Sequence, residues 1–366
     1  MEYEDYRSWM IKSVNYVPVL KCKAGEFTAL SISQASLKDD IVPIADLVPI
    51  QNKKKFEDHI QSSIGYIQKW DRERLLYIDG YMIQDIDLLV HRKRYMEYIF
   101  NELRKSKFNV IPVVSNISNP DYLNQITKII EKESSGVCLR IFADREKNIN
   151  DEIERMNSRI GLDLSMIDLL IDFRSLEILS INEILDWQKR ILSNLVYSSK
   201  WRSLVFAGSN FPIDLSELTP NQIHPISRKH WLAWKQLVKG SDIVRFPSYS
   251  DYGISHPSMS EVEGIPNASA SIRYTHENEY YVYRGRGTRQ HHYEQFFDLS
   301  EALINSNEYY KRDHCTGDQF IYKCGTEKEK TGSLTTWRWV GTNHHITVVT
   351  NQLRQFWRDF NANRTS

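Results

Sequence analysis

The sequence predicts an α/β fold, a (β/α)8 TIM-barrel-like domain with a C-terminal β-hairpin and an α+β extension. Short apolar, β-branched segments recur eight times between residues 17 and 247, and segments with the apolar period of an amphipathic helix lie between them. Strands that are apolar on both faces and alternate with helices are typical of a parallel sheet, and eight such units fit a closed barrel. An open doubly wound sheet is the alternative that the same alternation permits.

The predicted strands are five or six residues long and are bounded by polar or turn residues. They cover residues 17–21, 41–46, 75–79, 110–115, 137–142, 168–173, 203–208 and 242–247. Segments with helical periodicity cover residues 26–36, 55–70, 85–106, 121–134, 149–161 and 180–199, with a weaker one at 228–240 that ends at the helix-stopping Gly240.

The alternation ends after residue 247. A β-hairpin is predicted over residues 268–287, and a helix at about 290–306 is assigned as the eighth barrel helix. The predicted domains are therefore a barrel over 1–306, which includes the hairpin, and an extension over 307–366 that packs on it. The adjacent histidines of the β-branched segment 344–350 are placed on a strand, where they point to opposite faces.

Composition excludes several classes of protein. The 47 basic and 47 acidic residues balance, so nucleic-acid binding requires a local basic patch. Four cysteines in 366 residues are too few for a disulfide framework, which favours a reducing compartment. The charged N-terminus and the lack of a long apolar run favour a cytoplasmic protein that binds no membrane.

Several segments resemble one family. The run Y-V-P-V-L-K-C-K-A-G-E-F-T-A-L at 16–30 and I-V-P-I-A-D at 41–46 are similar to the start of the Beta protein family of bacteria and phages. Later segments agree: R-F-P-S-Y-S-D-Y-G at 245–253, I-R-Y-T at 272–275, Y-R-G at 283–285, G-D-Q-F-I at 317–321 and G-T-N-H-H-I at 341–346. The resemblance implies a setting near prophage or phage-defence genes, and it supplies no catalytic residues.

Charged residues lie at and just beyond the C-terminal ends of the predicted strands, at the barrel rim where active sites of this fold lie. Asp79, Asp172 and Asp251 are candidates for a general base or an electrostatic stabiliser, and Glu26 for a proton donor. Lys23, Arg140 and Arg245 are candidates for holding an anionic substrate, and Asp46 and Tyr252 belong to the same rim. The alternative is that Asp79, Arg140 and Asp172 form a buried ion network that fixes strand register.

Lys21 and Lys23 have the period-2 spacing of one strand face, and Gly25 and Glu26 follow where a helix begins. Backbone amides beside two lysines predict a phosphate site. The alternative is a solvated loop in which Glu26 stabilises the first turn of the helix.

The hairpin region interleaves arginines with tyrosines. Arginines bind phosphates and tyrosine rings stack on bases, so the region predicts a nucleic-acid-binding ribbon. An exposed ribbon with no ligand would have the same composition. The substrate-binding candidates here are Arg273, Tyr274, Arg284 and Arg286, and further on His344 and His345. Either histidine is a candidate to orient a substrate or shuttle a proton, while for at least one of them a structural role with satisfied hydrogen bonds is favoured.

No metal or cofactor is expected. Cys315 and Cys324 are nine positions apart, and neither a C-x-x-C pair nor a P-loop nor a G-x-G-x-x-G run is present. The resulting hypothesis is an antiphage-defence enzyme that acts on nucleic acid, most plainly a DNA glycosylase-type hydrolase that cleaves the N-glycosidic bond of a modified base. The alternatives are a non-catalytic phage-sensing or nucleic-acid-binding protein, with a protein partner, and a nuclease.

Overall fold

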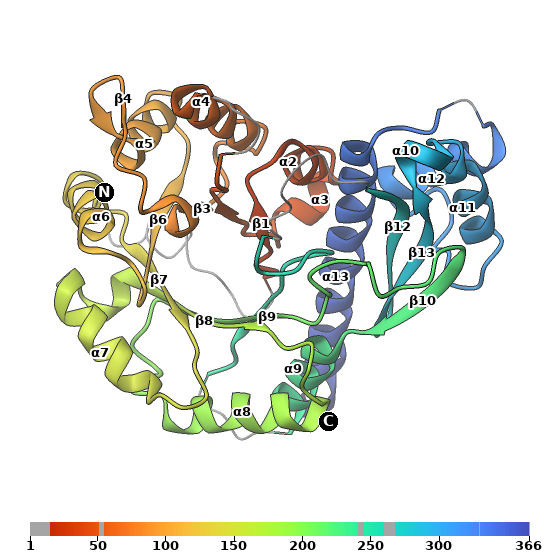
Figure 1. Ribbon diagram of the computed structural model, residues 1–366. Helices are drawn as coiled ribbons and strands as arrows, with labels where there is room; N and C mark the ends of the chain where they lie inside the picture. Colours follow the sequence, from red (N-terminus) through yellow and green to blue (C-terminus); the bar gives the residue numbers. More distant parts are fainter. Residues whose placement is uncertain (1–14, 51–54, 241–244, 260–267, 329, 366) are drawn as a thin grey trace.

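The computed structural model describes residues 15–50, 55–240, 245–259, 268–328 and 330–365. Eight parallel strands surround a common axis, and helices cover their outer face (Figure 1). The strands, in sheet order, are β1 (Val19–Lys21), β2 (Ile44–Asp46), β3 (Leu76–Asp79), β6 (Val110–Ser115), β7 (Val137–Phe142), β8 (Ile167–Ser175), β9 (Ser203–Ser209) and β11 (Ser248–Ser250).

The first and last strands meet, so the sheet closes into a barrel. The segment before β1 runs parallel to β11, with a bridge between Tyr16 and Tyr249. The Val17 amide donates to the Tyr249 carbonyl at 3.0 Å, and the Val19 amide donates to the Asp251 carbonyl at 2.8 Å. The predicted (β/α)8-like fold is therefore confirmed.

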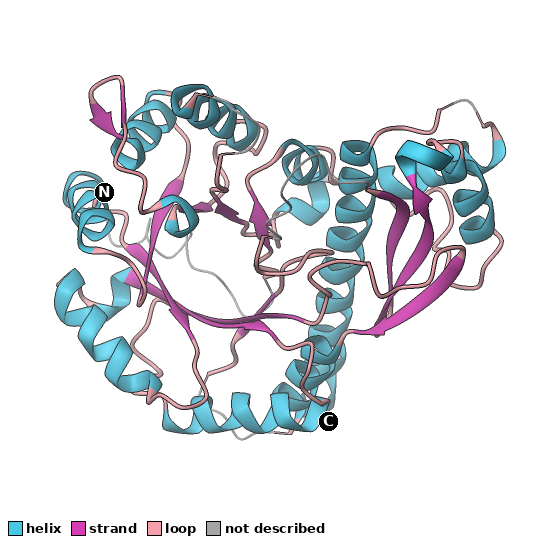
Figure 2. Ribbon diagram, viewed as in Figure 1, coloured by secondary structure: helices cyan, strands magenta, loops and turns pink. Residues whose placement is uncertain are grey.

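The helices that follow the strands pack their apolar faces on the barrel (Figure 2). On β1, Leu20 faces these helices, whereas Val19 faces the barrel interior with Ile44, Tyr77 and Val113. The helices are α2 (Ala24–Ser31), α3 (Ala35–Lys38), α4 (Phe56–Ile67), α5 (Tyr95–Lys105), α6 (Pro120–Glu133), α7 (Ile149–Ile160), α8 (Ile181–Asn194) and α9 (Lys229–Lys239), with short 3-10 turns η1 (Tyr81–Ile83) and η2 (Leu164–Met166).

The eighth helical position belongs to the last helix of the chain, α13 (Leu334–Thr365). Its residues Ile346, Val349 and Leu353 are buried in the same core as Trp234 of α9. The eighth helix was expected at about residues 290–306. That region forms α10 (Thr288–His291) and α11 (Gln295–Ile304), and α11 packs instead on the hairpin and on α12 (Thr316–Thr326).

A second, three-stranded antiparallel sheet stands beside the barrel, in the order β10-β13-β12. The predicted hairpin is present as β12 (Ser269–His276) and β13 (Glu279–Gly287). Strand β10 (Gln222–Ser227) was not predicted; it comes from the loop before α9 and pairs with β13. Helix α13 is about 48 Å long at 1.5 Å per residue, so it can pack on both the barrel and this sheet.

Two other expectations were wrong in the described residues. The eighth strand follows Pro247 instead of preceding it, and residues 245–247 are not in a strand, while 241–244 lie outside the described part. The helix expected from residue 85 starts only at Tyr95, because His91 and Arg92 have φ values of 47° and 64° and turn the chain between β4 (Leu89–Val90) and β5 (Lys93–Arg94).

Candidate anion-binding site at the barrel mouth

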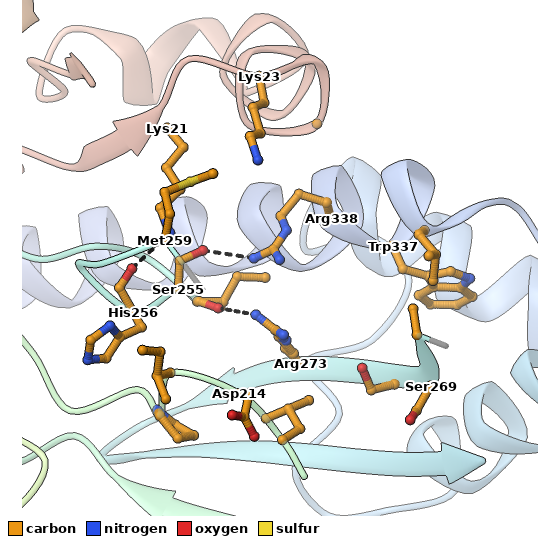
Figure 3. Close-up of a pocket in the computed structure, with 18 of the residues that line it drawn as sticks. Lys21, Lys23, Asp214, Ser255, His256, Met259, Ser269, Arg273, Trp337 and Arg338 are labelled. Atoms are coloured by element: carbon orange, nitrogen blue, oxygen red, sulfur yellow. Dashed lines mark hydrogen bonds between the residues drawn. The ribbon is translucent and has the colours of Figure 1, made fainter. Parts of the chain in front are cut away.

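A cavity of about 660 Å³ lies between the barrel mouth and the second sheet. Its walls come from the end of β1, the start of α2, the loop after β9, the segment after β11, strands β12 and β13, and the start of α13 (Figure 3). These segments come from both ends and from the middle of the chain. The cavity therefore exists only in the folded protein.

Cations outnumber carboxylates around the cavity, five against two. The carboxylates are Glu26 and Asp214. The cations come from β1, the N-cap of α2, β12, β13 and α13, and are Lys21, Lys23, Arg273, Arg284 and Arg338. This imbalance is local, because the whole chain has no net charge. A site with this balance favours an anionic ligand.

Lys21 ends β1, and its ammonium group enters the cavity wall. Its Nζ donates to the carbonyl oxygens of His256 at 3.0 Å and Ser258 at 2.9 Å, which are neutral acceptors. Burial, together with the positive charges of Arg338 and Lys23, lowers the pKa of Lys21 to about 8. Burial also lowers the pKa of Lys23. In both lysines burial is the largest cause, because it removes the charged ammonium group from water.

Arg273 and Arg284 face the cavity from neighbouring strands. Arg273 Nη1 donates to the Ile254 carbonyl at 2.8 Å, and its guanidinium lies 4.8 Å from the centre of the Phe211 ring. Burial and the positive charge of Arg338 hold the pKa of Arg273 well below its ordinary value. Arg284 Nε is buried without a hydrogen-bond partner. Among the described residues, neither guanidinium forms an ion pair.

Helix α2 begins at the cavity. Lys23 is its N-cap and makes no side-chain capping bond, and the first-turn residues Ala24, Gly25 and Glu26 line the wall. The free amide groups of a helix start favour an anion. Arg338 lies beside this turn, with Nη1 donating to Ser255 Oγ at 2.8 Å and Nε 3.8 Å from Glu26 Oε1. The helix start that was predicted to bind phosphate thus lies beside an arginine from α13.

A second charged cluster fills the barrel centre and is sealed from solvent. Arg140 lies 2.8 Å from carboxylate oxygens of each of Asp46, Asp79 and Asp172. Its Nη2 also donates to the Tyr252 hydroxyl at 2.7 Å, and all five side chains are buried. This arrangement matches the ion-network alternative, and none of the five lines the cavity. Burial raises the pKa of Asp46 to about 7 despite the attraction of Arg140.

Asp251 joins the barrel to the second sheet. It accepts hydrogen bonds from the Tyr16 hydroxyl at 2.5 Å and from the Gly253 amide at 2.9 Å, and lies 3.1 Å from His345 Nε2. His345 Nδ1 in turn lies 2.8 Å from Thr275 Oγ1. The cluster resembles a nucleophile, base and carboxylate, but every member is buried and none lines the cavity.

The remaining predicted residues lie elsewhere. Arg245 precedes β11 and is therefore at the other end of the barrel, where Nη2 donates to the Arg202 carbonyl at 2.7 Å. It was placed at the mouth because the strand was expected too early. Tyr274 is buried and stacks on His344, with ring centroids 3.8 Å apart, and Arg286 is exposed outside the cavity. The cavity thus gathers only part of the predicted set: Lys21, Lys23, Glu26, Arg273 and Arg284.

Two charged residues of the cavity were not predicted. Arg338 lies in an aromatic run that was read as part of the extension, and only the packing of α13 on α2 brings it to the site. Asp214 is in the loop after β9, which ends at Ser209. Its position just after a predicted barrel strand was the feature of the sequence that could have identified it as a rim residue.

The comparisons with known proteins agree with the resemblance in the sequence. A search of curated proteins found no match. Within the part of the chain that the structure describes, no helix has both the length and the apolar character of a membrane span. Residues 16–351 match the family model described as Beta protein, which is nearly the whole chain. The chain therefore belongs to the Beta protein family.

Proposed function

We propose that the cavity binds the phosphate group of a ligand of nucleotide size. The observation that carries this proposal is the set of five cations against two carboxylates, in which Arg273 and Arg284 form no ion pair with the described residues. A charge removed from water without a partner is costly. A bound phosphate would offset that cost, because arginine and helix amides match its oxygens.

The size and lining of the cavity favour a nucleotide over a bare phosphate ion. About 660 Å³ is within the usual range for sites that hold a small organic ligand. Apolar side chains share the walls with the cations, among them Ile213, Leu215, Ile254 and Trp337. A ligand with an anionic end and a flat, less polar body suits both parts of the lining.

The second sheet argues against a nucleic-acid strand stacked along the hairpin. Tyr274, Tyr280 and Tyr283 point into the protein core and are buried, so their faces are not available for bases. The proposed nucleic-acid ligand is therefore a single terminal or extruded nucleotide that enters the cavity. The sequence-based hypothesis of a nucleic-acid-binding hairpin is thereby restricted to a ligand of one nucleotide in the cavity.

The proposed reaction is hydrolysis of the N-glycosidic bond of that nucleotide. Glu26 is the candidate catalytic group, because it is the predicted carboxylate that lines the cavity. A carboxylate there would activate water or stabilise the positive charge that develops on the sugar. The alternative function is sensing without catalysis. It would use the same phosphate contacts, and Glu26 would have no catalytic role.

Equilibrium binding with the full chain tests the ligand. We expect nucleoside phosphates and 5′-phosphorylated oligonucleotides to bind, and the nucleoside without phosphate to bind weakly. Arg273→Gln and Arg284→Gln should each weaken binding about ten- to hundredfold, because each removes a charge-assisted contact. Arg286→Gln, on the same strand but outside the cavity, is the matched control. Equal affinity of all three variants for the phosphorylated ligands would overturn the proposal.

A product assay tests the reaction separately. Wild type incubated with modified and unmodified DNA should release free base and leave abasic sites, and Glu26→Gln should lose this activity while it retains phosphate binding. Binding without any product, in both proteins, would favour the sensor function.

A further inference from the structure

We propose that His314, Asp318 and His344 bind a zinc ion beside the second sheet, apart from the proposed nucleotide cavity. His314 lies in the loop before α12, Asp318 in the first turn of α12, and His344 in α13. One ligand atom from each residue can be chosen so that all three lie within 4.8 Å of one another. Two imidazoles and one carboxylate are ligands that zinc prefers.

His344 is oriented as a metal-binding histidine usually is. Its Nε2 lies 2.7 Å from the Thr275 carbonyl, which only accepts, so Nε2 carries a hydrogen. Its Nδ1 lies 2.9 Å from Asp318 Oδ2. A histidine that donates one ring N–H to a carbonyl presents its other nitrogen for a metal.

An ion pair between His344 and Asp318 does not explain the environment of His314. Its Nε2 is buried and has no hydrogen-bond partner in the described part of the chain. The ring stands beside that of His344, with centroids 5.6 Å apart. Buried polar atoms normally have a partner. A metal ion held jointly with the other two residues would provide one.

Asp318 is held so that one oxygen remains for the cluster. Tyr274 donates its hydroxyl hydrogen to Oδ1 at 2.7 Å, while Oδ2 faces His344. Cys315 Sγ donates to the same Oδ2 at 3.0 Å and lies outside the group of three whose ligand atoms converge. A zinc ion with three protein ligands takes water as its fourth ligand. Such a site would join α12, α13 and, through Thr275, the strand β12.

Metal titration of the full chain after treatment with a chelator tests the site. Cobalt(II) is the spectroscopic probe, and we expect one ion per chain with the visible absorption of a four-coordinate site, displaced by zinc. Zinc should also raise the melting temperature, because binding to the folded state alone stabilises it. Neither result depends on the nucleotide cavity, so failure of that function would leave this test unaffected.

Variants separate a zinc site from a structural ion pair. His314→Gln, a partly exposed loop residue that can be changed without removing the Asp318–His344 contact, should weaken zinc binding at least about tenfold. The exposed His291→Gln is the control and should bind as wild type does. Absence of cobalt absorption in wild type, or equal zinc affinity in His314→Gln, would show that the cluster is an ion pair only. Asp318→Asn is a second variant. We expect it to lose metal binding, and this loss is measured directly by cobalt absorption, whatever the change in melting temperature.

Discussion

Arg338, near the start of the last helix, lies directly against Gly25, in the first turn of the first barrel helix. A Cβ atom on Gly25 would stand 2.6 Å from Arg338 Cγ and 2.8 Å from its Cβ, closer than real atoms approach. Glycine at position 25 therefore lets the two helices meet and brings a guanidinium group to the cavity. The proposed phosphate site depends on this contact between two distant parts of the chain.

We expect Gly25→Ala to move Arg338 and to weaken ligand binding at the cavity. The added methyl group should also cost about 1–3 kcal/mol of stability, because the site is already filled. Gly65→Ala is the matched control, since a Cβ there meets nothing within 4 Å and α4 is helical at that point. It should be neutral or stabilising by up to about 1 kcal/mol. Urea unfolding and phosphate titration measure the two effects, and equal results for both variants would contradict the assignment.

We expect replacement of Arg140 to destabilise the protein strongly, because Arg140 is the cation of the buried network. Arg140→Met leaves Asp46, Asp79 and Asp172 together in the barrel centre without their cation, so we expect a loss of about 3–5 kcal/mol in the free energy of unfolding. Arg190→Met, exposed on α8, should change it by less than about 0.5 kcal/mol. Denaturant unfolding distinguishes them. A small loss in Arg140→Met would mean that water reaches the network.

We expect the raised pKa of Asp46 to make the free energy of unfolding depend on pH. Its pKa rises from 3.8 to about 7 on folding, chiefly through burial, so the folded state binds a proton that the unfolded state releases. This contribution to stability is full below pH 3.8 and is lost as the pH rises through about 7, with a slope of at most about 1.4 kcal/mol per pH unit. Asp46→Asn should reduce that slope. Unfolding free energies measured between these pH values test it, and an unchanged slope would refute it.

We expect the lowered pKa of Lys21 to make the affinity for a phosphate ligand depend on pH. Its pKa is about 8, and a bound phosphate favours the charged ammonium group. Affinity should therefore fall as the pH rises above about 8, where the phosphate itself no longer titrates. Lys21→Met should bind more weakly and lose this dependence, whereas Lys189→Met, exposed on α8, should keep it. Isothermal titration across this range gives the answer. A pH dependence that survives in Lys21→Met would assign it to another group.

The sequence alone was sufficient for most of the barrel. Strands such as β6 and β7 were predicted at their observed bounds, because residues buried on both faces of a sheet form unbroken apolar runs. Strand β11 was misplaced because its three residues are Ser-Tyr-Ser, which carry little apolar signal. Lys21, Lys23 and Glu26 were found together because one strand end and one helix start position all three within a few residues.

Only the tertiary structure decided which charged residues share a site. The spacing of Asp79 and Asp172 places them at strand ends, but whether solvent reaches them depends on the rings of Tyr81 and Phe142, which lie about 5 Å from the Arg140 guanidinium. The β-branched segment around Val348 and Val349 favours a strand locally, yet it is helical. Local preferences amount to about 1 kcal/mol or less per residue, and burial of the α13 face against the barrel outweighs them.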